Sequence, residues 1–284
     1  MWLIASTCHA QELTPRAYLI SPVHSNAIIL TYSFYTGAIL FDSTLPITGA
    51  SGRISLPTVS YYHALNLFGR SANVTASLPY SVGHFKGTVN GTLQSLYRSG
   101  LADSVYRFSV NLKGGPAMSI EQFQQWRQKT LIGASLKIVA PTGQYNPVAL
   151  INIGSNRWAF KPELGVSRRW GHWVVDTYGA VWLFTTNHEF FSHNQFFAGT
   201  NTQHQNPIGA FEGHLSYNVT LRLWISVDGN FWIGGRTSFN GVVNPNTLQA
   251  NSRIGGTAAI PLDSFCRKTP FVLKVSYNIQ KEEL

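Results

Sequence analysis

The sequence predicts an all-β protein, a transmembrane antiparallel up-and-down β-barrel, and two observations lead to this fold class. Segments of about ten residues alternate between apolar side chains and polar or small ones, which is the two-residue period of a β-strand. The connections between these segments alternate between long and short, as they do in outer-membrane barrels with long extracellular loops and short periplasmic turns. A soluble β-sandwich does not require that alternation.

Residues 157–167 show the strand period most clearly. Arg157, Lys161 and Glu163 occupy odd positions, whereas the even positions from Trp158 to Val166 are wholly apolar. About ten residues cross a bilayer at the tilt of a barrel strand. A register slip of one residue would move the charged side chains into lipid, at up to ~2–4 kcal/mol for each Lys or Arg. We therefore expect the apolar face to meet hydrocarbon and the charged face to line the interior.

Composition excludes other classes of protein. Of the 284 residues, 12% are charged, roughly half the usual share of a soluble domain. No uninterrupted apolar run reaches the ~18 residues of a membrane helix. The net charge of +9 does not indicate nucleic-acid binding, because the basic residues are scattered and no helix-turn-helix or zinc pattern accompanies them. Barrel loops that meet anionic lipopolysaccharide account for the charge more simply.

The N-terminus resembles the end of a secretory signal. Residues 1–10 are a short apolar piece followed by Cys8-His9-Ala10, which is similar to a cleavage site, but the basic first part of a signal is missing. We expect a start further upstream; a frayed terminus and, less favoured, a lipoprotein acceptor at Cys8 are the alternatives. Without this segment Cys266 is the only cysteine, so no intramolecular disulfide is predicted. Residues 11–25 are irregular and are expected in the periplasm.

Residues 26–284 are predicted to form the barrel, with about eleven strands of an expected twelve. Bacterial single-chain barrels have an even number of strands, and the chain ends at Leu284 without a terminal aromatic residue. We therefore expect the C-terminus to be truncated or frameshifted after Asn278. The predicted strands are residues 26–35, 53–67, 73–86, 101–112, 130–140, 157–167, 174–186, 208–219, 221–236, 253–262 and 271–278.

A short periplasmic helix is predicted to interrupt the strands. Ser119 and Gln122 have the spacing of a capping box, and Phe123 and Trp126 follow on one side of the helix. Such a helix either plugs the barrel mouth or caps a turn, and the second reading is favoured.

The inward-facing positions give the candidate site. Ionisable residues within membrane segments usually line a path or pair with one another, so we expect a ladder of ion pairs with a modest positive surplus. A filled lumen and an open pore both remain possible; an open one would favour anions such as aromatic carboxylates, with tryptophans as stacking surfaces. The lumen-lining candidates are Arg107, Lys137, Arg157, Lys161, Glu163, Asp176, Trp182, Glu212, His214, Trp224, Asp228, Trp232, Arg236, Arg253 and Lys274.

Several motifs carry a resemblance to a known family. They are Pro15-Arg16-Ala17-Tyr18, residues 40–46 (LFDSTLP), residues 67–73 (LFGRSAN), residues 156–163 (NRWAFKPE) and residues 234–237 (GGRT). With these motifs the chain resembles the Gram-negative outer-membrane family of phenol meta-pathway degradation proteins, also described as transporters. The resemblance implies a small barrel of twelve strands that takes up aromatic or hydrophobic compounds. Fold analogy alone does not name the compound.

No enzyme activity, metal or cofactor is predicted. The sequence lacks a Gly-x-Ser-x-Gly elbow, and His188 and His193 lie five residues apart rather than the four of the zinc helix motif. We interpret His214, with Glu212 and Asp228 nearby, as a satisfied luminal histidine rather than a catalytic base.

Two functions remain open, a transport channel and a closed barrel that binds through its aromatic loop 187–207. The expected partners are outer-membrane lipid and lipopolysaccharide, a small-molecule solute and the barrel assembly machinery, with no nucleic acid.

Overall fold

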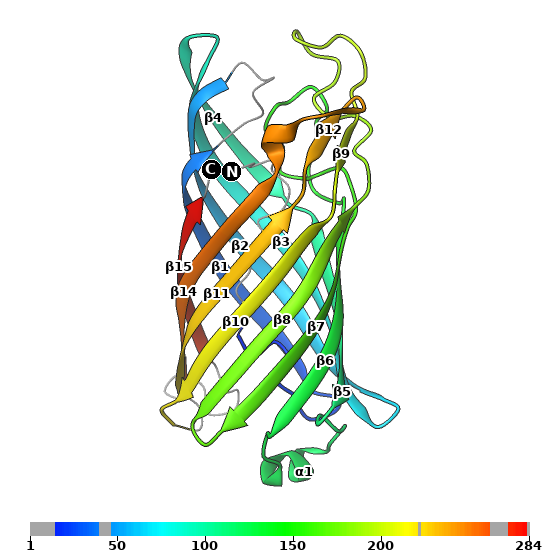
Figure 1. The fold of residues 1–284 in the computed structure, drawn as a ribbon, viewed down its shortest axis with the longest axis vertical. Helices are drawn as coiled ribbons and strands as arrows, with labels where there is room; N and C mark the ends of the chain where they lie inside the picture. The colour runs from blue at the N-terminus through cyan, green and yellow to red at the C-terminus, as the bar shows by residue number, and fades with distance from the viewer. Residues whose placement is uncertain (1–14, 40–46, 221–222, 262–271, 283–284) are drawn as a thin grey trace.

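The computed structural model describes residues 15–39, 47–220, 223–261 and 272–282, apart from the side chains of residues 38–39, 47, 260–261 and 272–282. Its main feature is an antiparallel sheet of twelve strands that curls into a tall barrel (Figure 1). In order round the wall the strands are β1 (Asn26–Ile39), β2 (Ile47–Leu67), β3 (Arg70–Val89), β5 (Ser104–Lys113), β6 (Thr130–Ala140), β7 (Ala159–Trp170), β8 (Trp173–Phe184), β10 (Ile208–Asn218), β11 (Trp224–Gly234), β14 (Gln249–Pro261) and β15 (Val272–Glu282), with β4 (Thr92–Leu101) also paired to β3.

Smaller elements lie at the two ends of the barrel. The strands β9 (Gln203–Gln205), β12 (Thr237–Phe239) and β13 (Val242–Val243) form a second small sheet at the long-loop end, followed by the 3₁₀ turn η2 (Pro245–Thr247). The helix α1 (Ile120–Gln125) lies at the opposite end (Figure 1). Its capping box is present as predicted from the sequence: the Gln122 backbone N–H donates to the Ser119 hydroxyl, and the Gln122 side chain accepts from the Ser119 N–H.

The strands β4 and β5 share one position in the wall. Residues Tyr80–Val89 of β3 pair with β4, and residues Ala72–Ser77 of the same strand pair with β5. Because β4 and β5 share a position, the twelve strands fill eleven positions in the wall, which agrees with the predicted count of about eleven. Among the described residues no backbone pairing joins β1 to β15. The hydrogen-bonded sheet therefore runs from β1 round the barrel to β15.

Strand boundaries differ from prediction mainly in the first hairpins. The range 130–140 is confirmed for β6, whereas β2 starts at Ile47 and β4 occupies a stretch predicted as polar loop. Glycine is a poor strand former in isolation, but here the β2 and β4 segments pair with neighbouring strands, and this tertiary context decides the outcome. A bulge between Thr48 and Ser51 absorbs the irregular start of β2.

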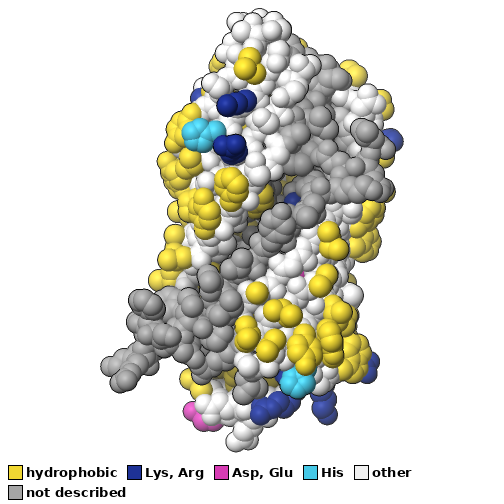
Figure 2. Space-filling model, turned by 90° about the vertical axis from the view of Figure 1, so that its left-hand side faces the viewer, with side chains coloured by type: hydrophobic (Ala, Val, Ile, Leu, Met, Phe, Trp, Pro, Cys, Tyr) yellow, Lys and Arg dark blue, Asp and Glu magenta, His cyan; other side chains and the backbone are white. Residues whose placement is uncertain are grey.

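The wall is apolar outside and polar inside, as the alternation predicts. Along β7 the outward residues Leu164 and Val166 are 62% and 42% exposed, while Lys161 is buried. Figure 2 shows apolar side chains over the described part of one outer face. A soluble protein buries such residues, so this surface fits hydrocarbon rather than water. Within the described residues no helix is long and apolar enough to cross a membrane.

Candidate functional site

Charged side chains from β5, β7, β10 and β11 meet inside the barrel. Lys161 of β7 lies at the centre: its Nζ is 2.9 Å from Glu163 Oε2 and 2.9 Å from Glu212 Oε1. On one side Arg107 of β5 extends the chain, with its Nη2 3.6 Å from Glu163 Oε1. Because a buried charge is costly unless it is paired, these contacts allow the strands to keep ionised groups in the interior.

The chain of contacts continues through a histidine to β14. His214 Nδ1 lies 2.9 Å from Asp228 Oδ1, and His214 Nε2 lies 3.7 Å from Glu212 Oε2. The hydroxyl groups of Ser226 and Thr257 donate to Asp228 at 2.9 and 2.6 Å. We call Arg107, Glu163, Lys161, Glu212, His214 and Asp228 the charged ladder; it crosses the inner wall from β5 to β11.

A row of cations lies within and beside this ladder. The backbone register pairs Arg107 with Lys137, and Lys137 with Lys161, so three basic residues lie side by side on β5, β6 and β7. The Nζ atom of Lys161 is also 5.9 Å from the ring centre of Trp182 on β8. We call Arg107, Lys137 and Lys161 the basic row. It places positive charge next to an aromatic surface.

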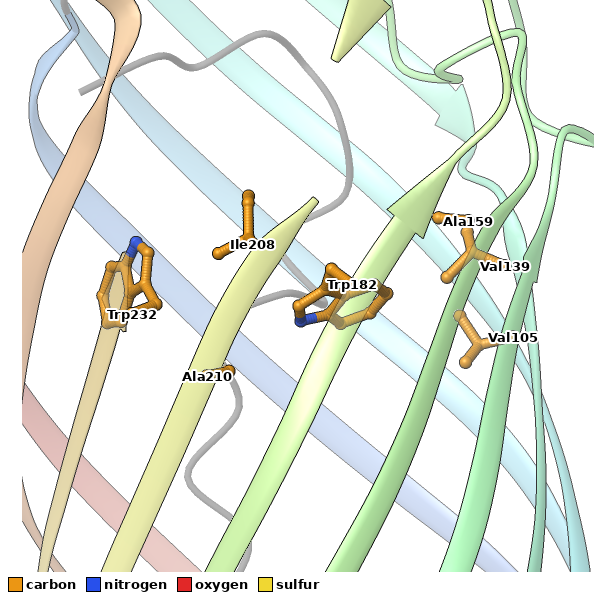
Figure 3. Close-up of a cluster of buried hydrophobic side chains, with 7 residues drawn as sticks. All are labelled: Val105, Val139, Ala159, Trp182, Ile208, Ala210 and Trp232. Carbon is orange, nitrogen blue, oxygen red and sulfur yellow. The ribbon is translucent and has the colours of Figure 1, made fainter. Parts of the chain in front are cut away.

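The three tryptophans predicted to line the lumen, Trp182, Trp224 and Trp232, lie in two different places. Trp182 and Trp232 belong to a buried cluster with Ile208, on the neighbouring strands β8, β11 and β10 (Figure 3). The Arg253 guanidinium lies 5.8 Å from the Trp232 ring. Trp224 is half-buried and lies 4.2 Å from the guanidinium of Arg16 instead.

Asp176 is fully buried on β8 and accepts a hydrogen bond from the Arg16 backbone N–H at 3.3 Å. The side chain of Lys274 lies outside the described residues.

Arg236 differs from the expectation, because it is exposed in the link between β11 and β12. The predicted strand continued the inward and outward alternation to residue 236. The structure ends β11 at Gly234, and Gly234 and Gly235 have φ angles of 123° and 72°. Such left-handed backbone breaks the alternation, so the side chain that follows no longer points inward.

Residues of the N-terminal segment lie inside the barrel rather than outside it. Tyr18 is 1% exposed, and its hydroxyl donates to Glu163 Oε1 at 3.0 Å. The Ala17 backbone N–H donates to the Tyr178 hydroxyl at 3.0 Å. The sequence placed this segment in the periplasm because it lacks strand periodicity, but its contacts are with residues far away along the chain.

Two glycines make room for the Tyr18 ring. Gly133 and Gly165 are direct partners in the β6–β7 register. A Cβ atom at either position would lie 2.1 or 2.2 Å from a carbon atom of the ring. The pair therefore forms a recess into which the tyrosine packs, with its edge against Tyr178. Glycine inside a strand is the sequence signal for such a close approach, and it could have identified this contact.

Arg157 lies in the link before β7, at the long-loop end of the interior. It is 2% exposed, and its Nη2 donates to Gln205 Oε1 at 2.5 Å, while its Nη1 has no hydrogen-bond partner among the described residues. The guanidinium lies over the Phe184 ring at 4.6 Å. Burial lowers the pKa of Arg157 to about 10, partly opposed by the charge of Asp103. The group is thus a cation at neutral pH, and it forms no ion pair with a described carboxylate.

Two of the histidines singled out in the sequence, His193 and His214, have local polar partners in the structure. The described residues contain no group of three or more His, Cys, Asp or Glu side chains placed to hold a metal ion. His193 belongs to the aromatic loop, where its Nε2 lies 3.2 Å from the Thr200 hydroxyl. The two ring nitrogens of His214 both face carboxylates.

A wall that is apolar outside and carries paired charges inside defines a membrane β-barrel. The family model described as "Putative MetA-pathway of phenol degradation" matches residues 47–264, so the chain belongs to this family. The crystal structure of the COG4313 outer membrane channel from Pseudomonas putida F1 has a similar fold, with a TM-score of 0.71 and 16% identity over 95% of this chain and 94% of that one. The search of curated proteins gave no match.

Proposed function

We propose that the protein is an outer-membrane channel for small organic anions, aromatic carboxylates in particular. The observation that carries this proposal is the basic row inside a wall whose outer face is apolar. Its three cations outnumber the two carboxylates, Glu163 and Glu212, that form ion pairs with it. Charges in a membrane segment are expensive, so a protein keeps them where they serve a path or a structure. The similar fold of an outer membrane channel and the membership in a family named for phenol degradation support the same function.

The aromatic surfaces support the proposed class of solute. Trp182 lies beside Lys161, and Phe184 lies beneath the guanidinium of Arg157, so cations and rings alternate towards the long-loop end. A carboxylate would meet the cations while its ring meets the aromatic side chains. Rings of positive side chains are a common source of anion selectivity in pores.

A closed barrel that binds without transporting is the second candidate. The specific observation in its favour is Tyr18, which is buried against the inner wall between the two glycines. On this account the binding surface is the aromatic loop, where Phe191 and Phe197 pack edge to face and Phe197 also contacts Phe239. Such a protein would show neither conductance nor solute uptake.

Liposome swelling separates the two candidates. We would compare benzenesulfonate with benzyltrimethylammonium, because both carry a ring and a permanent charge and neither becomes neutral at working pH. The channel account expects faster swelling in the anion. Replacing Lys137 by Gln should reduce this preference, whereas Lys129→Gln, at an exposed position between α1 and β6, should leave it unchanged. Equal or cation-favoured swelling, or none in either solute, would reject the proposal.

A further inference from the structure

The outer face of β2–β4 changes from apolar to basic towards the long-loop end. Arg53 pairs in register with His84, and His84 pairs with Tyr97. Lys86 is two residues further along β3, in the row of Ser51 and Ser95. In the upper part of Figure 2, Lys or Arg side chains lie beside a His side chain. We call Arg53, His84 and Lys86 the basic patch.

The side chains of the basic patch point outward and are exposed. Arg53 shares the strand face of Val59 and Tyr61, which are 54% and 51% exposed, and successive residues on one face are two apart. The His84 ring packs against Tyr97 with 4.9 Å between centres. None of the three basic side chains forms an ion pair with a described residue, and the sequence from Asn26 to Leu101 has Asp42 as its only acidic residue.

The patch lies just above the apolar belt. Tyr32 of β1 pairs with Pro57 of β2, and both side chains face outward. The next outward pair, further from the long-loop end, is Leu30 with Val59, and both are exposed. Arg53 is four residues beyond Pro57, about 13 Å along the strand at ~3.3 Å per residue. At a strand tilt of ~45° this is about 9 Å in height. Tyrosines typically mark the interface of a barrel, so the basic side chains lie at the level of lipid headgroups.

We propose that the basic patch binds the phosphate groups of lipopolysaccharide in the outer leaflet of the outer membrane. This inference rests on the proposed outer-membrane location, in which the long-loop end faces outward. Arginine offers a planar fork for phosphate oxygens and lysine a point charge, so the two complement each other at a phosphorylated sugar. The Tyr97, Ser51 and Ser95 side chains in the same two rows add hydroxyl groups.

Binding of defined lipids to the refolded full chain in detergent tests the proposal. The patch variant carries Arg53→Gln, His84→Gln and Lys86→Gln; the matched control carries Lys113→Gln and Lys129→Gln, which are exposed near the opposite end. The probes are bisphosphorylated lipid A, dephosphorylated lipid A, phosphatidylglycerol and inorganic phosphate. Removing three headgroup contacts should weaken binding of bisphosphorylated lipid A by at least about tenfold, and dephosphorylation should weaken binding to the wild type equally.

The arms of this experiment distinguish the possible outcomes. Unchanged lipid A binding in the patch variant overturns the inference. So does equal binding of phosphatidylglycerol, which would indicate a general anionic surface, or equal binding of inorganic phosphate, which would indicate a site for the free ion. Swelling rates of the patch variant should equal those of the wild type, because the patch is outside the lumen. A protein that binds lipid A but gives no swelling would contradict the proposed channel and leave this inference intact.

Discussion

The inner face of the barrel has two contrasting regions. From β5 to β11 it carries the charged ladder, whose members are joined at 2.9 to 3.7 Å. On β2 and β3 the inward positions carry uncharged side chains; Ile54 and Leu56 are buried, and the Ser60 hydroxyl donates to Ser77 at 2.7 Å. We call this second region the smooth wall.

The difference shows what the strand period does and does not determine. Both regions alternate with the same two-residue period, yet only one carries charges, and each member of the charged ladder lies beside an oppositely charged group on its own strand or on another strand of the wall. Burying a charge requires such a partner, whereas burying serine or leucine does not. An aromatic anion between the two regions would meet cations on one side and an uncharged surface on the other.

The largest expected effect concerns the centre of the ladder. Lys161→Met leaves Glu163 and Glu212 buried without their shared cation. Breaking such a pair costs about 3–5 kcal/mol. On the smooth wall, Ser60→Ala removes one neutral hydrogen bond, which is worth about 0.5–1.5 kcal/mol. Urea unfolding in lipid vesicles, followed by tryptophan fluorescence, measures both; equal losses would contradict the contrast between the regions.

A second prediction concerns the outer faces of the same two regions, which should behave alike. Leu164→Arg on β7 and Val59→Arg on β2 each place a charge on an exposed apolar position. Each should cost about 2–4 kcal/mol if the position meets the bilayer midplane. The same unfolding measurement applies. A negligible cost for both would mean that this surface does not face lipid.

A third prediction tests the packing of Tyr18 on the charged side. Gly165→Ala brings a methyl group to 2.2 Å from the ring, and overpacking of this kind costs about 1–3 kcal/mol. We expect residues 16–18 to leave the recess and single-channel conductance to rise. Gly213→Ala on β10 is the control, because a Cβ there meets nothing within 4 Å. Equal conductance in the two variants would show that Tyr18 does not limit the path.

The smallest expected effect is on selectivity at the long-loop end. Arg157→Gln removes a buried cation that forms no ion pair with a described carboxylate. The interaction of one such charge with a passing anion is about 1 kcal/mol in a water-like medium. The anion-to-cation permeability ratio should therefore fall by up to about fivefold, as measured from reversal potentials. A ratio that rises would place Arg157 outside the path.

The sequence predicted the wall well and the contents of the barrel only in part. Strand period and capping are local, so β6 and the capping box of α1 agree with expectation. Arg107, Lys161 and Glu163 were predicted on one face, and the structure shows them in contact.

The remaining features depend on contacts that periodicity cannot reveal. The Ala17 backbone N–H donates a hydrogen bond to the hydroxyl of Tyr178, 161 residues away in sequence. The N-terminal segment has no hydrophobic periodicity that could have indicated this contact. β4 forms because β3 offers it a partner, with Thr88 opposite Leu93. The side chain of Arg236 does not point inward as predicted, because the positive φ angles of Gly234 and Gly235 break the alternation just before it.

The reversal potential of the wild-type protein in a planar bilayer, under a gradient of potassium chloride, tests the central claim most directly. The account predicts a conductance that favours chloride, because the basic row and Arg157 lie along the interior. A conductance that favours potassium, or none in either the wild type or Gly165→Ala, would contradict it.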